Sequence, residues 1–180
     1  MDDRAVVEKQ LGRRPRAFLR VAGRCPFGLP AVTEQAPYDE HGDPFPTTYY
    51  LTCRHLVAAV ARLEAAGGVE RWGVLVAGDA ALTADLERAH EEQRRLRRAL
   101  AGGHVGRDEG TSLALGIGGS ASRVRLKCLH AHVAFALARR GHALGERVLD
   151  ELRPLWPAER CCTEASPGPR AASGAGEGRA

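Results

Sequence analysis

The sequence has few aromatic residues, almost no lysine and no long hydrophobic run. Aromatic side chains make up 5% of the 180 residues, and only two of the 26 basic residues are lysines. No apolar stretch approaches the roughly 18 residues that a membrane-spanning helix needs, and residues 1–16 lack the apolar core of a secretion signal. We therefore expect no membrane span and no signal peptide, and we expect a cytoplasmic protein.

The shortage of lysine also bears on the formal net charge of +4. A basic set made almost wholly of arginine, together with abundant alanine and glycine, is what GC-rich coding produces without selection for a partner. Nucleic-acid binding normally requires a clustered basic face supported by aromatic residues or by a recognition motif. No such motif is present, so nucleic acid is not an expected partner.

The overall composition is that of a folded protein. Hydrophobic residues make up 44% and charged residues 27% of the chain, as in ordinary globular domains, and the length corresponds to one domain. Residues 163–180 consist mostly of glycine, alanine, serine and proline and carry no large apolar side chain, so they cannot build a core. We predict one folded domain over residues 6–162 and a disordered tail over residues 163–180.

The first third of the domain has the pattern of short strands. Residues 16–25 alternate between polar and apolar side chains, and residues 47–51 are β-branched and aromatic. A further strand is predicted over residues 31–36, and the polar, proline-containing stretch 37–46 is typical of a loop. Three short strands in succession predict a small antiparallel sheet.

Beyond the strands the apolar residues recur at helical spacing. This pattern predicts helices over residues 52–66, 82–100, 122–140 and 145–152, with the glycine pair 67–68 ending the first of them. Strands followed by helices are typical of an α+β protein. The predicted fold is therefore a small antiparallel N-terminal sheet of about three strands followed by three to four helices.

The predicted helix over residues 82–100 carries a cluster of arginines. These are Arg94, Arg95, Arg97 and Arg98. We interpret them as a solvated face that pairs with Glu91 and Glu92. The alternatives are a stripe that binds nucleic acid and a surface that docks a partner protein.

A glycine-rich segment precedes the predicted helix over residues 122–140. Residues 116–121 formally fit the dinucleotide-binding pattern G-x-G-x-x-G/A, but no second strand follows that could carry the acidic ribose ligand. Free amides at a helix start can still hold an anion such as phosphate, whereas the alternative is a glycine turn without a ligand. The candidate anion-binding residues are Gly116, Gly118, Gly119, Ser120, Arg123, Arg125 and Lys127.

Five cysteines without a C-x-x-C pair and without a secretion signal do not indicate a disulfide framework. Several of them lie at the ends of predicted elements, where metal ligands can converge. Thiolate sites hold tetrahedral zinc or an iron–sulfur cluster, and spacing alone does not separate the two. The alternative is that small buried thiols fill the core. The cysteines are Cys25, Cys53, Cys128, Cys161 and Cys162.

Helix geometry indicates which histidines can join the cysteines. On a regular helix over residues 122–140, Cys128 and His132 lie four positions apart on one face and could bind one ion, whereas Cys128 and His130 could not. We expect His130 to be a core histidine with a hydrogen-bonded ring, unless the helix begins late. Both histidines are kept as candidate metal ligands.

A catalytic thiol is the competing chemistry. Cys53 follows Thr52, a candidate N-cap, so the start of the helix could lower the pKa of the Cys53 thiol. A phosphate-binding phosphatase loop would place arginine six positions further on, where this chain has Ala59. His55 and His90 are possible bases, although a surface or helix-capping role explains them more simply.

Four segments taken together resemble an uncharacterised bacterial family. They are RCPFGLPAV (24–32), GDPFPTTYYLTC (42–53), GIGGSASRVRLKCLHAH (116–132) and the cysteine pair 161–162. In this order they resemble the domain-of-unknown-function family 501. The resemblance implies that Cys25, Cys53, Cys128 and His130 occupy motif positions of that family, and that Cys161 or Cys162 matches its C-terminal cysteine.

The resemblance carries no activity, but it implies partners. Members of the family are commonly encoded beside a septum-formation protein and an exopolyphosphatase, which implies a partner in cell division or phosphate metabolism. This chain departs from the family pattern where Phe135 replaces a further histidine and His142-Ala143 replaces Asn-Pro. We expect a cysteine-based metal site, structural or redox-active. The alternatives are a metal-free interaction module for such a partner and an enzyme that binds an anion at residues 116–121.

Overall fold

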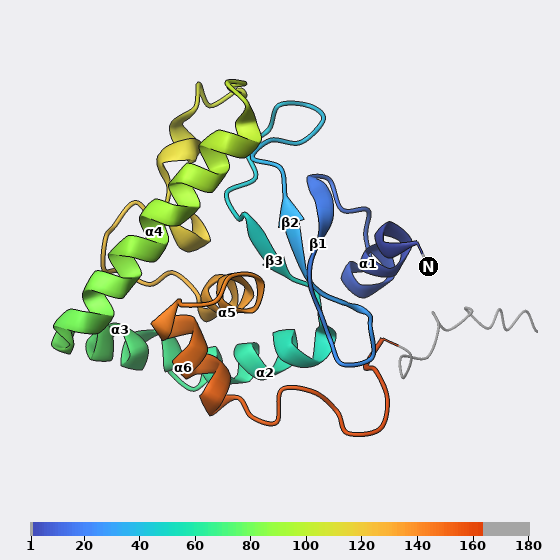
Figure 1. Ribbon diagram of the computed structural model, residues 1–180, viewed down its shortest axis with the longest axis vertical. Coiled ribbons are helices and arrows are strands. Elements are labelled where there is room, and N and C mark those ends of the chain that lie inside the picture. The colour runs from blue at the N-terminus through green and yellow to red at the C-terminus, as the bar shows by residue number, and fades with distance from the viewer. Residues whose placement is uncertain (1, 164–180) are drawn as a thin grey trace, which may run out of the picture.

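The computed structural model describes residues 2–163, so the predicted tail lies outside the described residues from position 164 onward. Within residues 2–163, a three-stranded antiparallel sheet is preceded by one α-helix and followed by five (Figure 1). The strands are β1 (Phe18–Arg24), β2 (Pro30–Gln35) and β3 (Tyr49–Leu51). The helices are α1 (Asp3–Leu11), α2 (Arg54–Ala65), α3 (Gly68–Gly78), α4 (Ala80–Ala101), α5 (Leu129–Ala138) and α6 (Ala143–Glu151). The predicted α+β class is confirmed.

The sheet has the order β1-β2-β3, and all six residues of the central strand are buried. Both outer strands run antiparallel to β2, so their carboxyl ends reach the same end of the sheet, beside the first residues of β2. The amide of Cys25 donates to the carbonyl of Leu29 (2.9 Å), and the amide of Cys53 donates to the carbonyl of Ala31 (3.2 Å). These bonds fix two cysteines from distant segments at one end of the sheet.

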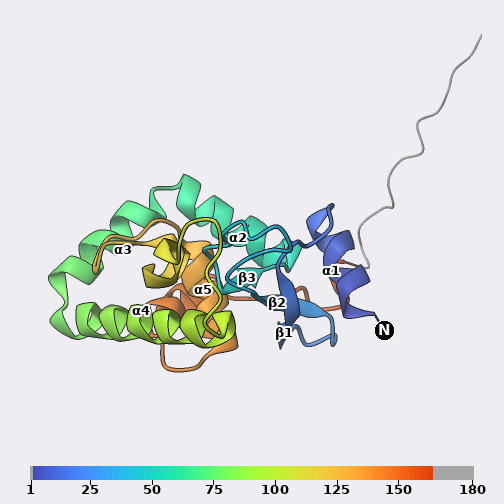
Figure 2. The same cartoon turned by 90° about the horizontal axis from the view of Figure 1, so that it is seen from above.

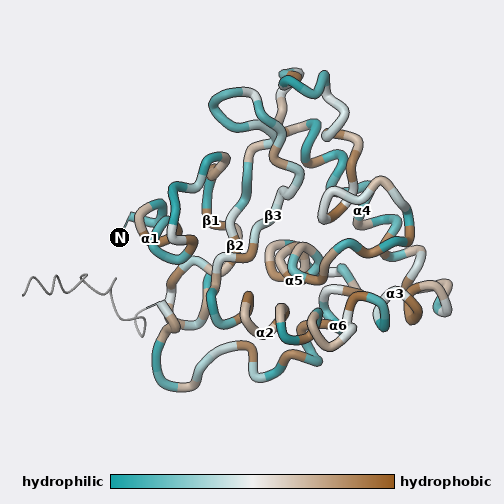
Figure 3. The backbone as a smooth tube through the Cα atoms, turned by 180° about the vertical axis from the view of Figure 1, so that it is seen from behind, coloured by the Kyte–Doolittle hydropathy of each residue, from teal (hydrophilic) through white to brown (hydrophobic). Residues whose placement is uncertain are grey.

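Helix α5 lies in the middle of the molecule, between the sheet and α4 (Figures 1 and 2). Seven of its ten residues are buried, and it packs against α6, β3 and α2. Figure 3 shows hydrophobic residues concentrated around α5, whereas hydrophilic residues dominate the peripheral loops. A helix that is apolar on all sides belongs in a core. Among the described residues, no helix combines the length and the apolar composition needed to cross a membrane.

Two helices, α1 and α3, are absent from the sequence prediction. Helix α1 is short and largely polar, and it begins where the side chain of Asp2 accepts a hydrogen bond from the amide of Arg4. The glycine pair does end α2, because Gly67 has a left-handed φ of 81°, but α3 begins at once with Gly68. A Cβ atom at Gly68 would lie 2.6 Å from the carbonyl oxygen of Leu63. The glycine pair therefore marks a tight junction between two helices.

The helix predicted over residues 122–140 is shorter, since α5 begins only at Leu129. The hydroxyl of Ser120 lies 3.1 Å from the carbonyl oxygens of Ser122 and of Arg125, and these contacts hold the preceding segment as a loop. Cys128 has an extended backbone, with φ −158° and ψ 154°. The prediction that Cys128 and His132 share one helix face is therefore wrong, because Cys128 precedes the helix.

Helix α4 carries the arginine cluster, and two of the four arginines pair with Glu91 as predicted. Arg97, in contrast, is completely buried. Its guanidinium group donates to the carbonyl oxygens of Phe45 (2.8 Å) and Ser112 (3.1 Å). The prediction of a solvated face is wrong for Arg97, because the loops that carry Phe45 and Ser112 fold over this side of α4.

Candidate functional site

Four of the five cysteines lie at one end of the sheet. Cys25 follows β1, and Cys53 is the residue before α2. The segment after α6 runs back to the sheet (Figure 1) and brings Cys161 and Cys162 to the same end. The fold thereby joins the ends of two strands to the C-terminal part of the described chain.

The four sulfur atoms form two pairs. The Cys25 Sγ atom lies 4.0 Å from the Cys161 Sγ atom, and the Cys53 Sγ atom lies 3.7 Å from the Cys162 Sγ atom. None of the four is in a disulfide bond, which would be about 2.05 Å long. Each C-terminal cysteine has a partner of its own, so both Cys161 and Cys162 belong to the cluster.

Buried polar contacts attach this C-terminal segment to the rest of the fold. The side-chain amide of Gln10 in α1 donates to the carbonyl oxygen of Pro30 (2.7 Å) and to the hydroxyl of Thr163 (3.1 Å). Gln10 and Thr163 are both buried, where a hydrogen bond made within the protein replaces one lost to water. These contacts hold the segment with Cys161 and Cys162 against α1 and β2.

Burial raises the pKa of the clustered thiols. The pKa of Cys53 rises to about 12, because desolvation and the neighbouring Cys162 outweigh the amides of Leu56 and His55 at the start of α2. Burial also raises the pKa of Cys161. The prediction that the helix start lowers the pKa of Cys53 is therefore wrong. Both thiols are protonated at neutral pH.

The residues predicted to hold zinc or an iron–sulfur cluster do not form one group in this structure. Four of the cysteines form two pairs, Cys128 lies apart at the start of α5, and His130 and His132 have other partners. Among residues 2–163, no group of three or more histidine, cysteine, aspartate or glutamate side chains is arranged to hold a metal ion.

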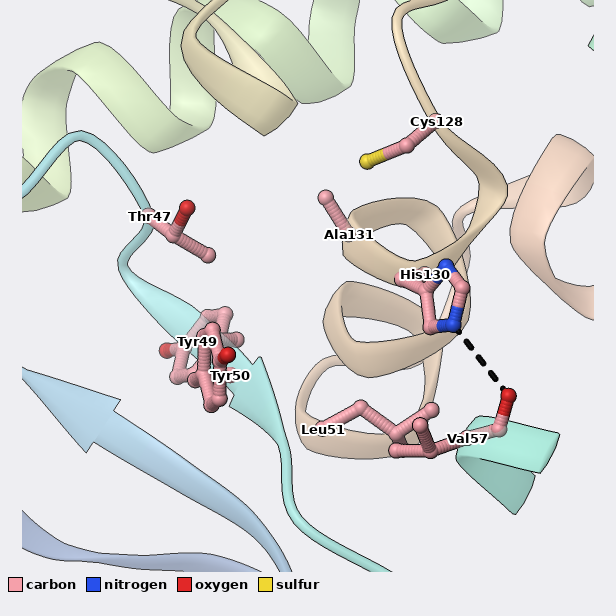
Figure 4. Close-up of a pocket in the computed structure, with 8 residues that line it drawn as sticks. All are labelled: Thr47, Tyr49, Tyr50, Leu51, Val57, Cys128, His130 and Ala131. Atoms are coloured by element: carbon pink, nitrogen blue, oxygen red, sulfur yellow. Dashed lines mark hydrogen bonds between the residues drawn. The ribbon is translucent and has the colours of Figure 1, made fainter. Parts of the chain in front are cut away.

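Cys128 lines a cleft between β3 and the start of α5 (Figure 4). The cleft, called the Cys128 cleft below, has a volume of about 310 Å³ and is lined by Thr47, Tyr49, Tyr50, Leu51, Val57, Cys128, His130 and Ala131. Burial raises the pKa of the Cys128 thiol, although the amides of Ala131 and His130 favour its thiolate form. The cleft therefore contains a neutral thiol at neutral pH.

His130 lines the Cys128 cleft, but its ring nitrogens are engaged with other groups. The Nδ1 atom lies 3.1 Å from the Glu64 carboxylate, and the Nε2 atom lies 3.2 Å from the carbonyl oxygen of Val57 (Figure 4). Both neighbours are acceptors, so the ring of His130 faces a hydrogen-bond acceptor at each nitrogen. His130 has a hydrogen-bonded ring, but it is not a core residue, since its side chain is 29% exposed at the late start of α5. Both of its ring nitrogens lie against groups other than Cys128.

His132 belongs to a separate, buried chain of side chains. The carboxylate of Asp85 accepts a hydrogen bond from Nδ1 of His142 (3.3 Å), and Nε2 of His142 lies 3.0 Å from Nδ1 of His132. Because the carboxylate fixes the hydrogen of His142 on Nδ1, the Nε2 atom of His142 accepts from His132. The ring of His90 is the next neighbour, with its centroid 6.2 Å from that of His132.

Burial keeps the imidazoles of His90 and His132 neutral at neutral pH. It lowers the pKa of His90 to about 4 and the pKa of His132 well below its usual value. The pKa of Asp85 lies at about 2, because hydrogen bonds from His142 and Arg88 outweigh the opposing effect of burial. The interpretation of His90 as a surface or capping residue is wrong, since its side chain is only 1% exposed. The spacing of Asp85, His90, His132 and His142 in the sequence does not predict that their side chains lie next to one another.

The glycine segment 116–121 is closed by its own hydrogen bonds. Four amides donate within the segment or to a buried side chain, namely those of Gly116, Ile117, Gly119 and Ser120. The ammonium group of Lys127 donates to the carbonyl oxygen of Gly119. The predicted anion site depended on free amides, but these four amides already donate hydrogen bonds within the protein. The candidate donors outside these contacts are the amide of Gly118 and the exposed side chains of Arg123 and Arg125.

Comparison with known families adds one finding. The family described as protein of unknown function (DUF501) matches residues 21–150, which is more than half of the chain. The chain belongs to the DUF501 family. The matched region contains Cys25, Cys53 and the whole Cys128 cleft, and it ends before Cys161. No curated protein and no solved structure matches the chain. The family description names no activity.

Proposed function

We propose that this protein is a thiol–disulfide redox protein in which Cys25 pairs with Cys161 and Cys53 pairs with Cys162. The observation that carries the proposal is the sulfur pairing, with separations of 4.0 and 3.7 Å between residues that lie 136 and 109 positions apart. Forming each disulfide brings two sulfurs about 2 Å closer. Oxidation then ties the C-terminal segment covalently to the sheet, and reduction leaves it held by noncovalent contacts such as that of Gln10 with Thr163.

Each oxidation breaks two S–H bonds and forms one S–S bond. The pair gives up two electrons and two protons to an oxidant such as hydrogen peroxide, which becomes two molecules of water, or a small disulfide, which becomes two thiols. Cys162 is the only one of the four cysteines that is not fully buried, so we expect the oxidant to react there first. In the expected cytoplasmic compartment, disulfides are typically transient and redox-sensing.

The raised pKa values determine how fast this chemistry proceeds. The thiolate is the reacting form of cysteine, and burial raises the pKa of both Cys53 and Cys161. Closing the disulfides requires the buried thiols of Cys53 and Cys161 to lose their protons, so we expect this closing step to be slow at neutral pH and faster as the pH rises. Such a site suits a response to sustained oxidation better than rapid catalytic turnover.

Zinc binding by the same four cysteines is the second candidate function. Bonds of about 2.3 Å in a tetrahedral zinc–thiolate site place the sulfurs about 3.8 Å apart, which is close to both measured separations. Zinc would also deprotonate thiols whose pKa is raised. The two sulfur pairs would have to close around one ion, since no three of the described residues are arranged for this purpose.

The experiment starts from full-length protein purified without oxygen. Zinc, iron and sulfide are measured first, and the protein is then treated with oxidised glutathione and its disulfides are mapped by mass spectrometry. We expect the two linkages Cys25–Cys161 and Cys53–Cys162, with Cys128 left reduced. Cys161→Ser should remove only the first linkage, and Cys128→Ser is the matched control that should leave both.

Two results would contradict the redox proposal. Scrambled linkages would show that the pairs have no preference for each other in solution. One equivalent of bound zinc that blocks oxidation would favour the second candidate. An absence of both metal and specific linkages would overturn both functions.

A further inference from the structure

We propose that the Cys128 cleft binds a small neutral ligand with a single aromatic ring and a hydroxyl or carbonyl group. The cleft is independent of the redox proposal, because Cys128 is the one cysteine outside the two sulfur pairs. It lies where two distant segments meet, with residues 47–51 on one side and residues 128–131 on the other (Figure 4).

The size of the cleft limits the ligand. A volume of about 310 Å³ corresponds to about ten water molecules and lies at the lower end of the range of ligand pockets. A molecule with one ring fits such a space, whereas a dinucleotide does not. The cleft therefore cannot serve as the nucleotide site that the glycine pattern formally resembles.

The walls of the cleft favour an aromatic ligand. Leu51, Val57 and Ala131 supply apolar surface, and transfer of such surface from water to a ligand is favourable. The ring of Tyr50 adds an aromatic wall, against which a second ring packs edge-on or offset. The hydroxyl groups of Thr47 and Tyr50 are the polar groups that could orient a ligand hydroxyl or carbonyl.

The charges around the cleft favour a neutral ligand. His130 is the one lining residue able to carry a positive charge, and its ring is already paired with the Glu64 carboxylate. The same carboxylate accepts hydrogen bonds from the amides of Leu129 and His130 at the start of α5. Glu64 thus occupies the position that an anionic ligand would take at this helix start.

The test uses 4-methylphenol as the neutral probe and 4-methylbenzoate as its charged counterpart. Each is titrated into the full-length protein while backbone amide signals are followed by NMR. We expect 4-methylphenol to cause saturable shifts at Leu51, Cys128 and Ala131, and to bind at least about tenfold more tightly than 4-methylbenzoate. Equal or tighter binding of the benzoate would overturn the proposal of a neutral ligand.

Variants that fill the cleft locate the binding site. Ala131→Phe should weaken 4-methylphenol binding by about tenfold or more, and Val57→Phe provides a second filled cleft if the first variant does not fold. Val74→Ala, at an exposed position of α3, is the control and should bind as the wild type does. Wild-type affinity in a folded filled variant would overturn the proposal.

Chemical protection gives an independent readout. A bound ring should slow the alkylation of Cys128 by iodoacetamide, as measured for each cysteine by mass spectrometry, while the alkylation of Cys162 stays unchanged. Equal alkylation of Cys128 with and without saturating 4-methylphenol would overturn the proposal. The comparison with Cys162 also keeps this result separate from any failure of the redox proposal.

Discussion

At the scale of single residues, two buried polar side chains, His90 and Arg97, hold separate segments of the fold together. His90 is neutral because it is buried, and its Nδ1 atom accepts a hydrogen bond from the amide of Ile117 (2.9 Å). Arg97 is fully buried and bonded to carbonyl and hydroxyl oxygens. Both residues stabilise the fold through contacts that an apolar side chain could not make, and both effects can be measured.

The histidine chain predicts a loss of stability in mild acid. The pKa of His90 lies near 6.5 in the unfolded chain and at about 4 in the folded protein, so the unfolded chain binds the proton more readily. The contribution of neutral His90 to the free energy of unfolding is fully present above pH 6.5. Between pH 6.5 and pH 4 this contribution falls by about 3 kcal/mol. Urea unfolding across this range measures the loss.

A matched pair of variants assigns this loss to His90. His90→Gln should reduce the slope of the pH dependence and leave the part that His132 contributes through its own lowered pKa, whereas His41→Gln, at an exposed position, should leave the slope unchanged. Identical slopes for His90→Gln and the wild type would contradict the assignment. The pKa of Asp85 is lowered to about 2, so its own contribution is lost only below its unfolded value of 3.8 and does not overlap this window.

Arg97 predicts a contrast within the arginine cluster of α4. Arg97→Ala removes the hydrogen bonds to Phe45 and Ser112 and leaves a cavity, so we expect the free energy of unfolding to fall by about 3 kcal/mol. Arg95→Ala changes an exposed side chain on the same helix and should cost less than about 0.5 kcal/mol. Urea unfolding at pH 7.5 compares the two, and similar losses would show that Arg97 is not a buried anchor.

At the scale of elements, glycine has opposite roles at two positions of α3. Gly68→Ala places a Cβ atom 2.6 Å from the carbonyl oxygen of Leu63, so the variant should be destabilised by about 1–3 kcal/mol. Gly73 has no atom within 4 Å of such a Cβ, so Gly73→Ala should stabilise the helix by about 0.5–1 kcal/mol. Thermal unfolding distinguishes them, and a stabilised Gly68→Ala would refute the close approach.

The sequence predicted the elements whose pattern is local. The strand over residues 31–36 and the helix over residues 82–100 agree with β2 and α4 within a few residues, because hydrophobic periodicity and turn residues are read within a short window. Helix α3 was missed because its three glycines lower helix propensity, while its stability comes from packing. The late start of α5 depends on hydrogen bonds of Ser120 and Ser122, which periodicity does not report.

For the candidate site, the sequence predicts which residues take part but not which of them lie together. The sequence identified all five cysteines, but the partners of Cys25 and Cys53 lie 136 and 109 positions away, where no spacing rule applies. The contact of His130 with Glu64 and the chain from Asp85 to His132 are equally non-local. Such contacts are set by how α4, α5 and α2 pack, which the sequence encodes only through the whole fold.

At the scale of the whole molecule, the two sulfur pairs predict a redox-dependent stability. A disulfide between Cys25 and Cys161 would close a loop of more than 100 residues, which is worth about 5 kcal/mol in the chain-entropy model. We expect the oxidised protein to melt about 10 °C or more above the reduced protein. Thermal scans with and without reductant measure the difference.

Two variants provide the controls for this experiment. The double variant Cys161→Ser, Cys162→Ser should melt at the same temperature with and without reductant, and Cys128→Ser should keep the full wild-type difference. A redox-dependent shift that survives in the double variant would show that other thiols are responsible.

The return of the C-terminal segment to the sheet also sets an order of events during protein synthesis. The sheet and its two strand-end thiols emerge from the ribosome first, whereas Cys161 and Cys162 are added more than 100 residues later. Synthesis adds about 5–20 residues per second. Cys25 and Cys53 are therefore part of the growing chain for several seconds before Cys161 and Cys162 are added. A released chain that ends before position 161 would therefore keep every described helix and strand but would leave the thiols of Cys25 and Cys53 without partners and open to wrong cross-links.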